Sequence, residues 1–273
     1  MVAPQCRDTA RARLLVAYDG RAFHGFASQP GVQTVAGTLG DSVARVARQA
    51  VELTCAGRTD AGVHAWGQVV SLDLPAGTDL ARLQRAVNRM LAPRVVLREA
   101  VWAPAGFDAR RWALSRAYRY TLDCSAWPSP FTAGISWHVG RRLDLRAMQA
   151  ASDALLGEHD FSSFCHAVKG LPGPIVRRVL RAEWHELGDS GLRFDIEARS
   201  FCHQMVRSLV GTLVEVGEGR RRAGEMLAIL RAANRAAAGG IAPPHGLCLW
   251  RVSYPEQPPA GAAEETTGTA QRA

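Results

Sequence analysis

The sequence lacks the features of several protein classes. It has no Cys-x-x-Cys pair, so a cysteine-based metal ribbon is not indicated; the cysteines are scattered at Cys6, Cys55, Cys124, Cys165, Cys202 and Cys248. It has no apolar run of about 18 residues, so we expect no membrane span and no membrane partner. It has no leader-like opening either, so we expect a cytoplasmic protein with reduced cysteines. A chain of 273 residues can bury a substantial core without disulfides.

Lysine is nearly absent as well, because Lys169 is the single lysine among 33 basic residues. The formal net charge of +8 favours an anionic partner such as a nucleic acid. Arginine suits that partner, since its guanidinium binds phosphate and stacks on bases. A genome rich in G+C would also favour arginine over lysine, and many basic proteins bind no nucleic acid. Charge alone therefore leaves nucleic-acid binding open.

The most informative segment is the run Gly57-Arg58-Thr59-Asp60-Ala61-Gly62-Val63-His64-Ala65. Residues 51–55 are apolar enough for a strand, and residues 66–74 resume a strand-like alternation, which makes the run a loop between two strands. Its glycines allow sharp turns or a close approach to a ligand. Arg58 can keep Asp60 ionised, and an ionised, positioned carboxylate can act as a nucleophile. The structural alternative is a tight turn in which Asp60 binds its own backbone and Arg58 faces solvent.

Helical spacing and alternation predict mixed secondary structure in both halves of the chain. The predicted helices cover residues 35–50 after an N-cap at Thr34, 78–91 before Pro93, a stretch capped by Asp144, about 205–217, and 220–233 opened by Arg220-Arg221-Arg222. The predicted strands include residues 14–18, 95–97, 101–102, 116–122 and 191–199. Two halves, 1–112 and 113–255, predict an α+β fold with a mostly antiparallel sheet. Residues 256–273, rich in Pro, Gly, Ala and Thr, are expected to be disordered.

The Asp60 run, followed by Gly67-Gln68-Val69, closely resembles the signature of the tRNA pseudouridine synthase A family. The resemblance extends from about Arg13 to Pro255, and it is specific because several short motifs agree in order and spacing. These motifs are Tyr18-Asp19-Gly20, Phe23-His24-Gly25-Phe26, Gln33-Thr34-Val35, Phe107-Asp108-Ala109-Arg110, Arg116-Ala117-Tyr118-Arg119-Tyr120, residues 155–161, Phe201, residues 203–207, Gly246-Leu247 and Tyr254-Pro255. The chain departs from the family pattern at Ala27, Ser28 and Ala36, where RNA contacts are not implied.

The resemblance implies an enzyme that converts uridine to pseudouridine at positions 38, 39 and 40 of the tRNA anticodon stem-loop. It implies two ferredoxin-like halves in one extended sheet flanked by helices, a basic cleft, and a homodimer that holds tRNA across both subunits. The reaction breaks the bond from C1′ to N1, rotates the uracil and rejoins it through C5. Because this is an isomerisation without redox change or group transfer, we expect no cofactor and no metal. The resemblance makes Asp60 the nucleophile, and attack at C1′, attack at C6 and assistance to proton removal all stay open.

The resemblance also places Arg58 and Arg207 with Asp60 in catalysis and assigns the substrate to Tyr118, His64, Gln68 and Arg110. Tyr118 is expected to pack against the flipped base, although a strand tyrosine can equally fill a core. Arg207 is expected to pair with Asp60, and Arg58 to fill the space that the flipped base leaves. If they are only surface charges, these arginines would each contribute under about 1 kcal/mol to the stability of the fold. His64 and Gln68 either shape the loop or touch the RNA backbone.

The sequence leaves two alternatives from other classes, a zinc protein and an RNA-binding protein without catalysis. The repeat Ser-Phe-Cys-His at residues 163–166 and 200–203 offers four potential zinc ligands. Neighbouring Cys and His side chains point in different directions on a strand or helix, which disfavours one shared ion. A zinc deaminase is set aside because the H-x-E and P-C-x-x-C patterns are missing. A catalytically silent RNA-binding relative remains the rival, although such a protein has no need for Asp60.

Overall fold

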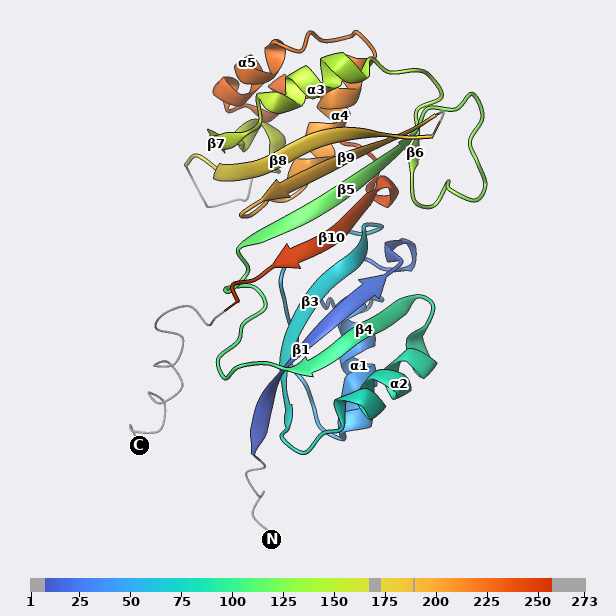
Figure 1. Cartoon of the computed structure of the whole chain (residues 1–273), viewed down its shortest axis with the longest axis vertical. Coiled ribbons are helices and arrows are strands. Elements are labelled where there is room, and N and C mark those ends of the chain that lie inside the picture. Colours follow the sequence, from blue (N-terminus) through green and yellow to red (C-terminus); the bar gives the residue numbers. More distant parts are fainter. Residues whose placement is uncertain (1–7, 167–172, 189, 257–273) are drawn as a thin grey trace. The chain divides into compact units, whose positions relative to one another are not determined.

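The chain forms an α+β fold with a mostly antiparallel sheet, as the sequence predicts. The computed structural model describes residues 8–166, 173–188 and 190–256 (Figure 1). Contacts divide the chain into two compact units, residues 1–114 with 252–273 and residues 115–251. Nearly all of the tail predicted to be disordered, residues 257–273, lies outside the described residues, and so does Lys169. No helix in the described ranges combines the length and the apolar character needed to cross a bilayer.

The first unit is built on a small antiparallel sheet in the order β4-β1-β3, with β2 added beside β3. Its strands are β1 (Thr9–Tyr18), β2 (Thr54–Cys55), β3 (His64–Pro75) and β4 (Val95–Trp102). The central strands carry fully buried side chains such as Leu14, Val16 and Val70. Burying a side chain of this size contributes about 1.5–3 kcal/mol, so this face supplies much of the unit's stability.

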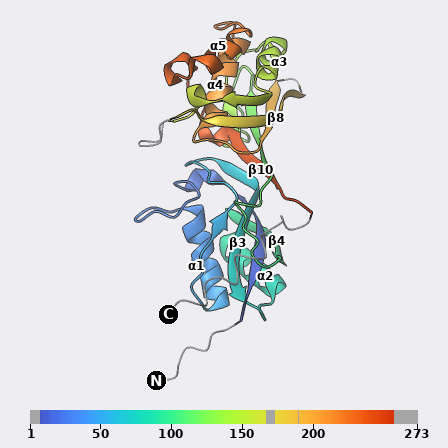
Figure 2. The same cartoon turned by 90° about the vertical axis from the view of Figure 1, so that its left-hand side faces the viewer.

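Two contacting helices supply the other side of this core, and Figure 2 shows α1 beside the strands of the unit. Helix α1 (Val35–Ala47) begins at the predicted cap, because Thr34 Oγ1 accepts a hydrogen bond from the Gly37 amide at 3.2 Å. Helix α2 (Leu80–Leu91) begins later than predicted. Asp79 is its N-cap, and the Thr78 hydroxyl donates to the Pro75 carbonyl instead. A short 3-10 turn, η1 (Gly20–Ala22), follows β1.

The second unit contains a sheet in the order β10-β5-β9-β8-β7. Its strands are β5 (Ser115–Asp123), β6 (Trp137–His138), β7 (Gly157–Asp160), β8 (Val176–Leu187), β9 (Gly191–Ala198) and β10 (Leu247–Ser253), whose last two residues group with the first unit. The pair β5–β6 is parallel, and the β5–β9, β7–β8 and β8–β9 pairs are antiparallel. Tyr120 pairs with Phe194, and Trp184 stacks on Phe194 with ring centroids 4.8 Å apart. These rings form the centre of the unit's core.

Three helices accompany this sheet: α3 (Leu145–Asp153), α4 (Met205–Gly217) and α5 (Glu225–Ala232). Short 3-10 turns occur at η2 (Ser162–Phe164), η3 (Arg235–Ala237) and η4 (Pro244–Gly246). Asp144 caps α3 as predicted, by accepting from the Ala147 amide at 3.0 Å. The predicted start of the last helix at Arg220 is wrong. Arg220 and Arg221 bind Glu218 and Glu215, and these arginines belong to the turn before α5.

A buried acidic residue breaks the simple alternation predicted for β9. Asp195 lies on the polar side of the strand, yet it is only 2% exposed. Arg193 Nε lies 2.8 Å and Arg119 Nε 3.4 Å from its Oδ1, and Arg181 Nη2 lies 3.2 Å from its Oδ2. Arg119 also stacks over the Trp250 ring at 3.7 Å. A buried carboxylate is tolerated here because several cations surround it.

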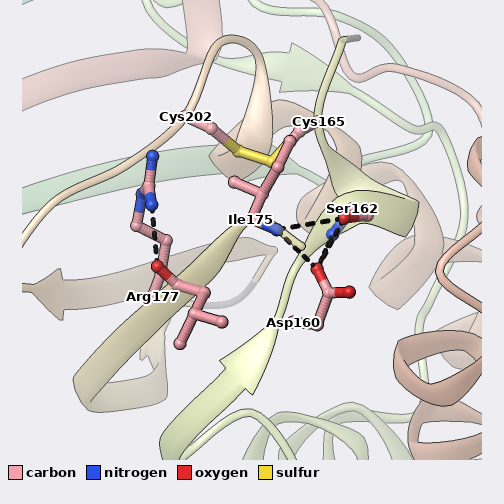
Figure 3. The surroundings of a disulfide bond; sticks show 7 residues. Asp160, Ser162, Cys165, Ile175, Arg177 and Cys202 are labelled. Atoms are coloured by element: carbon pink, nitrogen blue, oxygen red, sulfur yellow. Dashed lines mark hydrogen bonds between the residues drawn. A yellow bond between two sulfur atoms is a disulfide. The ribbon is translucent and has the colours of Figure 1, made fainter. Parts of the chain in front are cut away.

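A disulfide joins the two Ser-Phe-Cys-His repeats, so the expectation that all cysteines are reduced is corrected (Figure 3). Cys165 follows η2 and Cys202 precedes α4, with Cα atoms 5.8 Å apart. The repeats lie side by side, because the His166 amide donates to the His203 carbonyl at 3.2 Å. Among the described residues, no group of three or more His, Cys, Asp or Glu side chains is arranged to hold a metal ion. The sequence pattern did not indicate this contact, because 37 residues separate the two cysteines.

Reduction of this disulfide is expected to destabilise the protein. It closes a loop of 37 residues, for which chain entropy gives about 3–4 kcal/mol of stabilisation. Urea unfolding with and without reductant measures the difference, and a Cys165→Ser/Cys202→Ser variant should show none. Alkylation of the unfolded protein without reductant, followed by mass spectrometry, should modify Cys6, Cys55, Cys124 and Cys248 and spare the pair. Full modification of Cys165 and Cys202 would show that the protein carries them as thiols.

Candidate active site

The Asp60 loop connects β2 to β3, as the sequence predicts for a strand-loop-strand segment. Its three central residues differ in burial: Arg58 is exposed, Thr59 is buried and Asp60 is half-buried. A tight turn follows, in which the Val63 amide donates to the Asp60 carbonyl at 3.2 Å. Gly62 has a φ of +78°, a conformation that favours glycine. The carboxylate therefore sits on a constrained loop without being enclosed by it.

Residues 19–26 pack directly against the backbone of this loop. The Phe26 amide donates to the Thr59 carbonyl at 3.0 Å. A Cβ atom on Gly25 would meet the same carbonyl oxygen at 2.9 Å, and one on Gly20 would meet the Val63 carbonyl oxygen at 2.1 Å. Both glycines are therefore needed for close backbone contact. The two motifs that carry the resemblance at Tyr18 to Phe26 and at Gly57 to Ala65 meet here.

Two buried polar side chains, Tyr18 and Gln68, bind the same loop. The Tyr18 hydroxyl lies 2.7 Å from Thr59 Oγ1. Gln68 Nε2 donates to the Gly57 carbonyl at 2.7 Å and to the Tyr18 hydroxyl at 3.4 Å. Gln68 is fully buried at 0% exposure. These are contacts that shape the loop, which is one of the two roles considered for Gln68.

His64 is the other loop residue predicted from sequence, and it is buried. Its Nδ1 lies 3.2 Å from the Gly20 amide and 3.3 Å from Asp19 Oδ1. A neutral ring accepts from the amide through this nitrogen, whereas a protonated ring would donate to the carboxylate. The hydrogen bond from the Arg21 side chain lowers the pKa of Asp19 and keeps it charged. His64 thus joins the loop to the 19–26 segment.

Arg110 lies on the segment after β4 and is exposed. Asp108 Oδ1 accepts from the Arg110 and Arg111 amides at 2.8 and 2.7 Å, which fixes the turn. Burial raises the pKa of the Cys55 thiol, and the charges of Arg58 and Arg110 lower it in part. Both arginines are therefore close enough to act on one residue of β2. The first unit thus holds Arg58, Asp60 and His64 on or beside one loop, with Gln68 bonded to it and Arg110 near the end of β2.

Tyr118 and Arg207 belong to the second unit. Tyr118 lies on β5, is 8% exposed and packs edge-to-face on Phe201 with ring centroids 5.1 Å apart. Arg207 lies on the first turn of α4, where its Nε donates to the Ala242 carbonyl at 2.8 Å. The Ala242 amide donates back to the Arg207 carbonyl at 3.1 Å. Both residues are thus held by neighbours within their own unit.

Sequence reasoning did not single out Tyr18, Thr59 or Gly20 as contributors to this site. All three stand inside the motifs that carry the resemblance, so the signal was present. Their roles depend on contacts between residues about 40 positions apart, and no local pattern shows such contacts. The glycine and the two hydroxyls become informative only once β1 and β3 are paired.

Comparison with known proteins supplies an independent line of evidence. A family model described as tRNA pseudouridine synthase matches residues 14–109 and 151–255. A tRNA pseudouridine synthase A from Frankia casuarinae is 43% identical over 271 residues and covers 94% of each chain. The Leifsonia xyli protein of that name is 40% identical, covering 94% of this chain and 96% of its own. The Bacillus subtilis protein is 37% identical and covers 89% of this chain and 99% of its own.

The close approach at Gly20 yields a stability prediction. Gly20→Ala should lower the free energy of unfolding by about 1–3 kcal/mol, because the new Cβ would overlap a backbone carbonyl that cannot move aside. Gly77→Ala is the matched control, since a Cβ there meets nothing within 4 Å, and it should change stability by under about 0.5 kcal/mol. Urea unfolding measures both. Equal stability of the two variants would contradict the close packing of residues 19–26 on the loop.

Proposed function

Because this chain belongs to the tRNA pseudouridine synthase family, we propose that it isomerises uridine at positions 38, 39 and 40 of the anticodon stem-loop, with Asp60 as nucleophile. The chain is an isomerase that acts on tRNA. The single observation that carries the choice of Asp60 is its setting. It is a half-buried carboxylate between a buried Thr59 and a tight turn, on a loop that also carries the exposed Arg58. A buried anchor beside an accessible carboxylate suits a nucleophile that must be held in place.

The proposed reaction requires few chemical groups besides this carboxylate. The bond from C1′ to N1 breaks, uracil rotates, and a bond forms from C1′ to C5 while the proton on C5 is lost and N1 gains one. Atoms and electrons balance within the nucleotide, so the proposed mechanism uses no cofactor. Asp60 attacks either C1′ of the ribose or C6 of the base, and both routes use an ionised carboxylate.

The remaining residues are given supporting roles in this proposal. Tyr118, whose ring is held edge-to-face on Phe201, is assigned to pack against the flipped base. Arg207 pairs with Asp60. Arg58, which is exposed, fills the space that the flipped base leaves, and exposed Arg110 contacts phosphate. His64 and the rest of the loop's buried contacts set its shape.

The oligomeric state and the cellular location of the enzyme are also part of the proposal. We propose a homodimer that binds tRNA in the cytoplasm, with the Asp60 loop in the N-terminal half and Tyr118 and Arg207 in the C-terminal half. The net charge of +8 supports attraction to tRNA. RNA binding without catalysis, the rival from sequence, gives way to the enzyme because the chain belongs to the pseudouridine synthase family and carries Asp60 on an anchored loop.

Loss of the Asp60 carboxylate should abolish the reaction and spare binding. Asp60→Ala and Asp60→Asn are expected to form no pseudouridine in unmodified tRNA transcripts, while their Kd for tRNA stays within a few-fold of wild type. Asp73→Ala is the matched control, because this exposed aspartate on β3 pairs only with Arg11 among the interactions described, and its activity should be unchanged. Pseudouridine mapping on the transcripts provides the readout. An Asp60→Ala enzyme with undiminished turnover would falsify the assignment.

Removal of the Tyr118 ring should slow the chemical step. Tyr118→Ala is expected to reduce the single-turnover rate about tenfold or more, because a flipped base loses its stacking partner. Tyr118→Phe keeps the ring and should lose less. Thermal melting of both variants checks that the contact with Phe201 does not carry the effect. Full speed in a folded Tyr118→Ala enzyme would remove Tyr118 from the site.

A further inference from the structure

We infer that Tyr18, Thr59 and Gln68 form a positioning relay that fixes the Asp60 loop for the reaction. The inference rests on the proposed function of Asp60 and adds three residues that act through it. None of the three side chains is exposed, and each is 8% exposed or less. They are therefore positioning residues, whose effect reaches the substrate only through the carboxylate.

The relay begins on β3 at Gln68. Its Nε2 donates to the Gly57 carbonyl at 2.7 Å, and this contact fixes the orientation of the amide because a carbonyl oxygen can only accept. The same nitrogen donates to the Tyr18 hydroxyl oxygen at 3.4 Å. One buried amide thus binds the first residue of the loop and the neighbouring strand β1.

The second step passes from β1 to the loop. The Tyr18 hydroxyl, which accepts from Gln68, lies 2.7 Å from Thr59 Oγ1. Either hydroxyl can donate this second hydrogen bond, so the three side chains form one connected network. Hydrogen bonds linked in this way strengthen one another in a buried setting. Thr59 is the residue directly before Asp60.

Hydrogen bonds fix the backbone before and after Asp60. The Gly57 carbonyl accepts from the Gln68 side chain, and the Thr59 carbonyl accepts from the Phe26 amide. The Asp60 carbonyl accepts from Val63 at 3.2 Å. With the Thr59 side chain also bound, the backbone on both sides of the reactive residue is fixed while its side chain stays half-buried. Small displacements of a reacting group cost large factors in rate, so this bracketing serves catalysis.

One atom of the Gln68 side chain is unfavourable for the stability of the fold. Within the described part of the chain, Gln68 Oε1 is buried and has no hydrogen-bond partner. An unsatisfied buried oxygen is destabilising, whereas the hydrogen bond from Gln68 Nε2 to the Gly57 carbonyl is stabilising. The two effects oppose each other, so stability alone gives little reason for a glutamine at this position. The relay explains it, because only a donor can bind both Gly57 and Tyr18.

The test compares turnover, tRNA binding and melting temperature in Tyr18→Phe, Thr59→Val and Gln68→Met. Each should lower kcat by about tenfold to a hundredfold and leave the Kd for tRNA within a few-fold, with a loss of kcat that does not follow the modest fall in melting temperature expected from a lost buried hydrogen bond. Thr59→Ser keeps the hydroxyl and should restore most of the rate. The double variant Tyr18→Phe/Thr59→Val should be no slower than the slower single variant, because both remove one bond.

Two matched controls lose the same chemical groups elsewhere in the first unit. Gln84→Met removes an amide that donates to the Leu97 and Arg98 carbonyls, and Thr78→Val removes a hydroxyl bound to the Pro75 carbonyl. Both should turn over at the wild-type rate. Equal rate losses in controls and relay variants, or rates that follow the melting temperature, would reduce the relay to ordinary stability.

Asp60→Ala is run beside these variants to separate two failures. If Asp60→Ala is inactive and all three relay variants keep the wild-type kcat, the relay is wrong and the proposed function stands. If Asp60→Ala stays active, the proposed function fails, and the relay fails with it.

Discussion

The close contact between the 19–26 segment and the Asp60 loop is the constraint on which the site depends. Gly20 and Gly25 bring the two backbones together, and the Phe26 amide binds the Thr59 carbonyl. Side chains larger than hydrogen at these glycines would separate the segments. Without that contact the loop would lose the hydrogen bond from the Phe26 amide to the Thr59 carbonyl. It would also lose the hydrogen bond between Tyr18 on β1 and the Thr59 hydroxyl. The hydrogen bonds from Tyr18 and Gln68 are effective only because this backbone contact already places the loop over β1 and β3.

The arrangement places the anchoring residue and the proposed nucleophile next to each other in the chain. Thr59 is buried and carries the anchoring bonds, whereas Asp60, one residue later, is half-buried. Exposed Arg58 lies on the same loop, and the charges of Arg58 and Arg110 both act on Cys55 at the end of β2. In the proposed mechanism the carboxylate has to be both fixed and accessible, and neighbouring residues divide those tasks.

Local signals in the sequence predicted the local parts of the fold. Thr34 and Asp144 cap α1 and α3 as expected, because capping depends on residues only three positions apart. The start of α5 was wrong, since Arg220 and Arg221 are held by Glu218 and Glu215 in a turn. The disulfide between Cys165 and Cys202 and the burial of Gln68 could not be predicted either. Each depends on segments that meet only after the sheets form. Local spacing along the chain does not indicate such long-range contacts.

The most direct measurement of the central claim concerns where the carboxylate sits, not whether it is charged. Asp60→Glu keeps the charge and the loop but moves the carboxylate outward by about one carbon–carbon bond. Single-turnover assays on an unmodified tRNA transcript should show that this variant binds tRNA as the wild type does and forms almost no pseudouridine. Turnover at the wild-type rate would contradict the account, because a loosely placed acid would then serve as well as a fixed one.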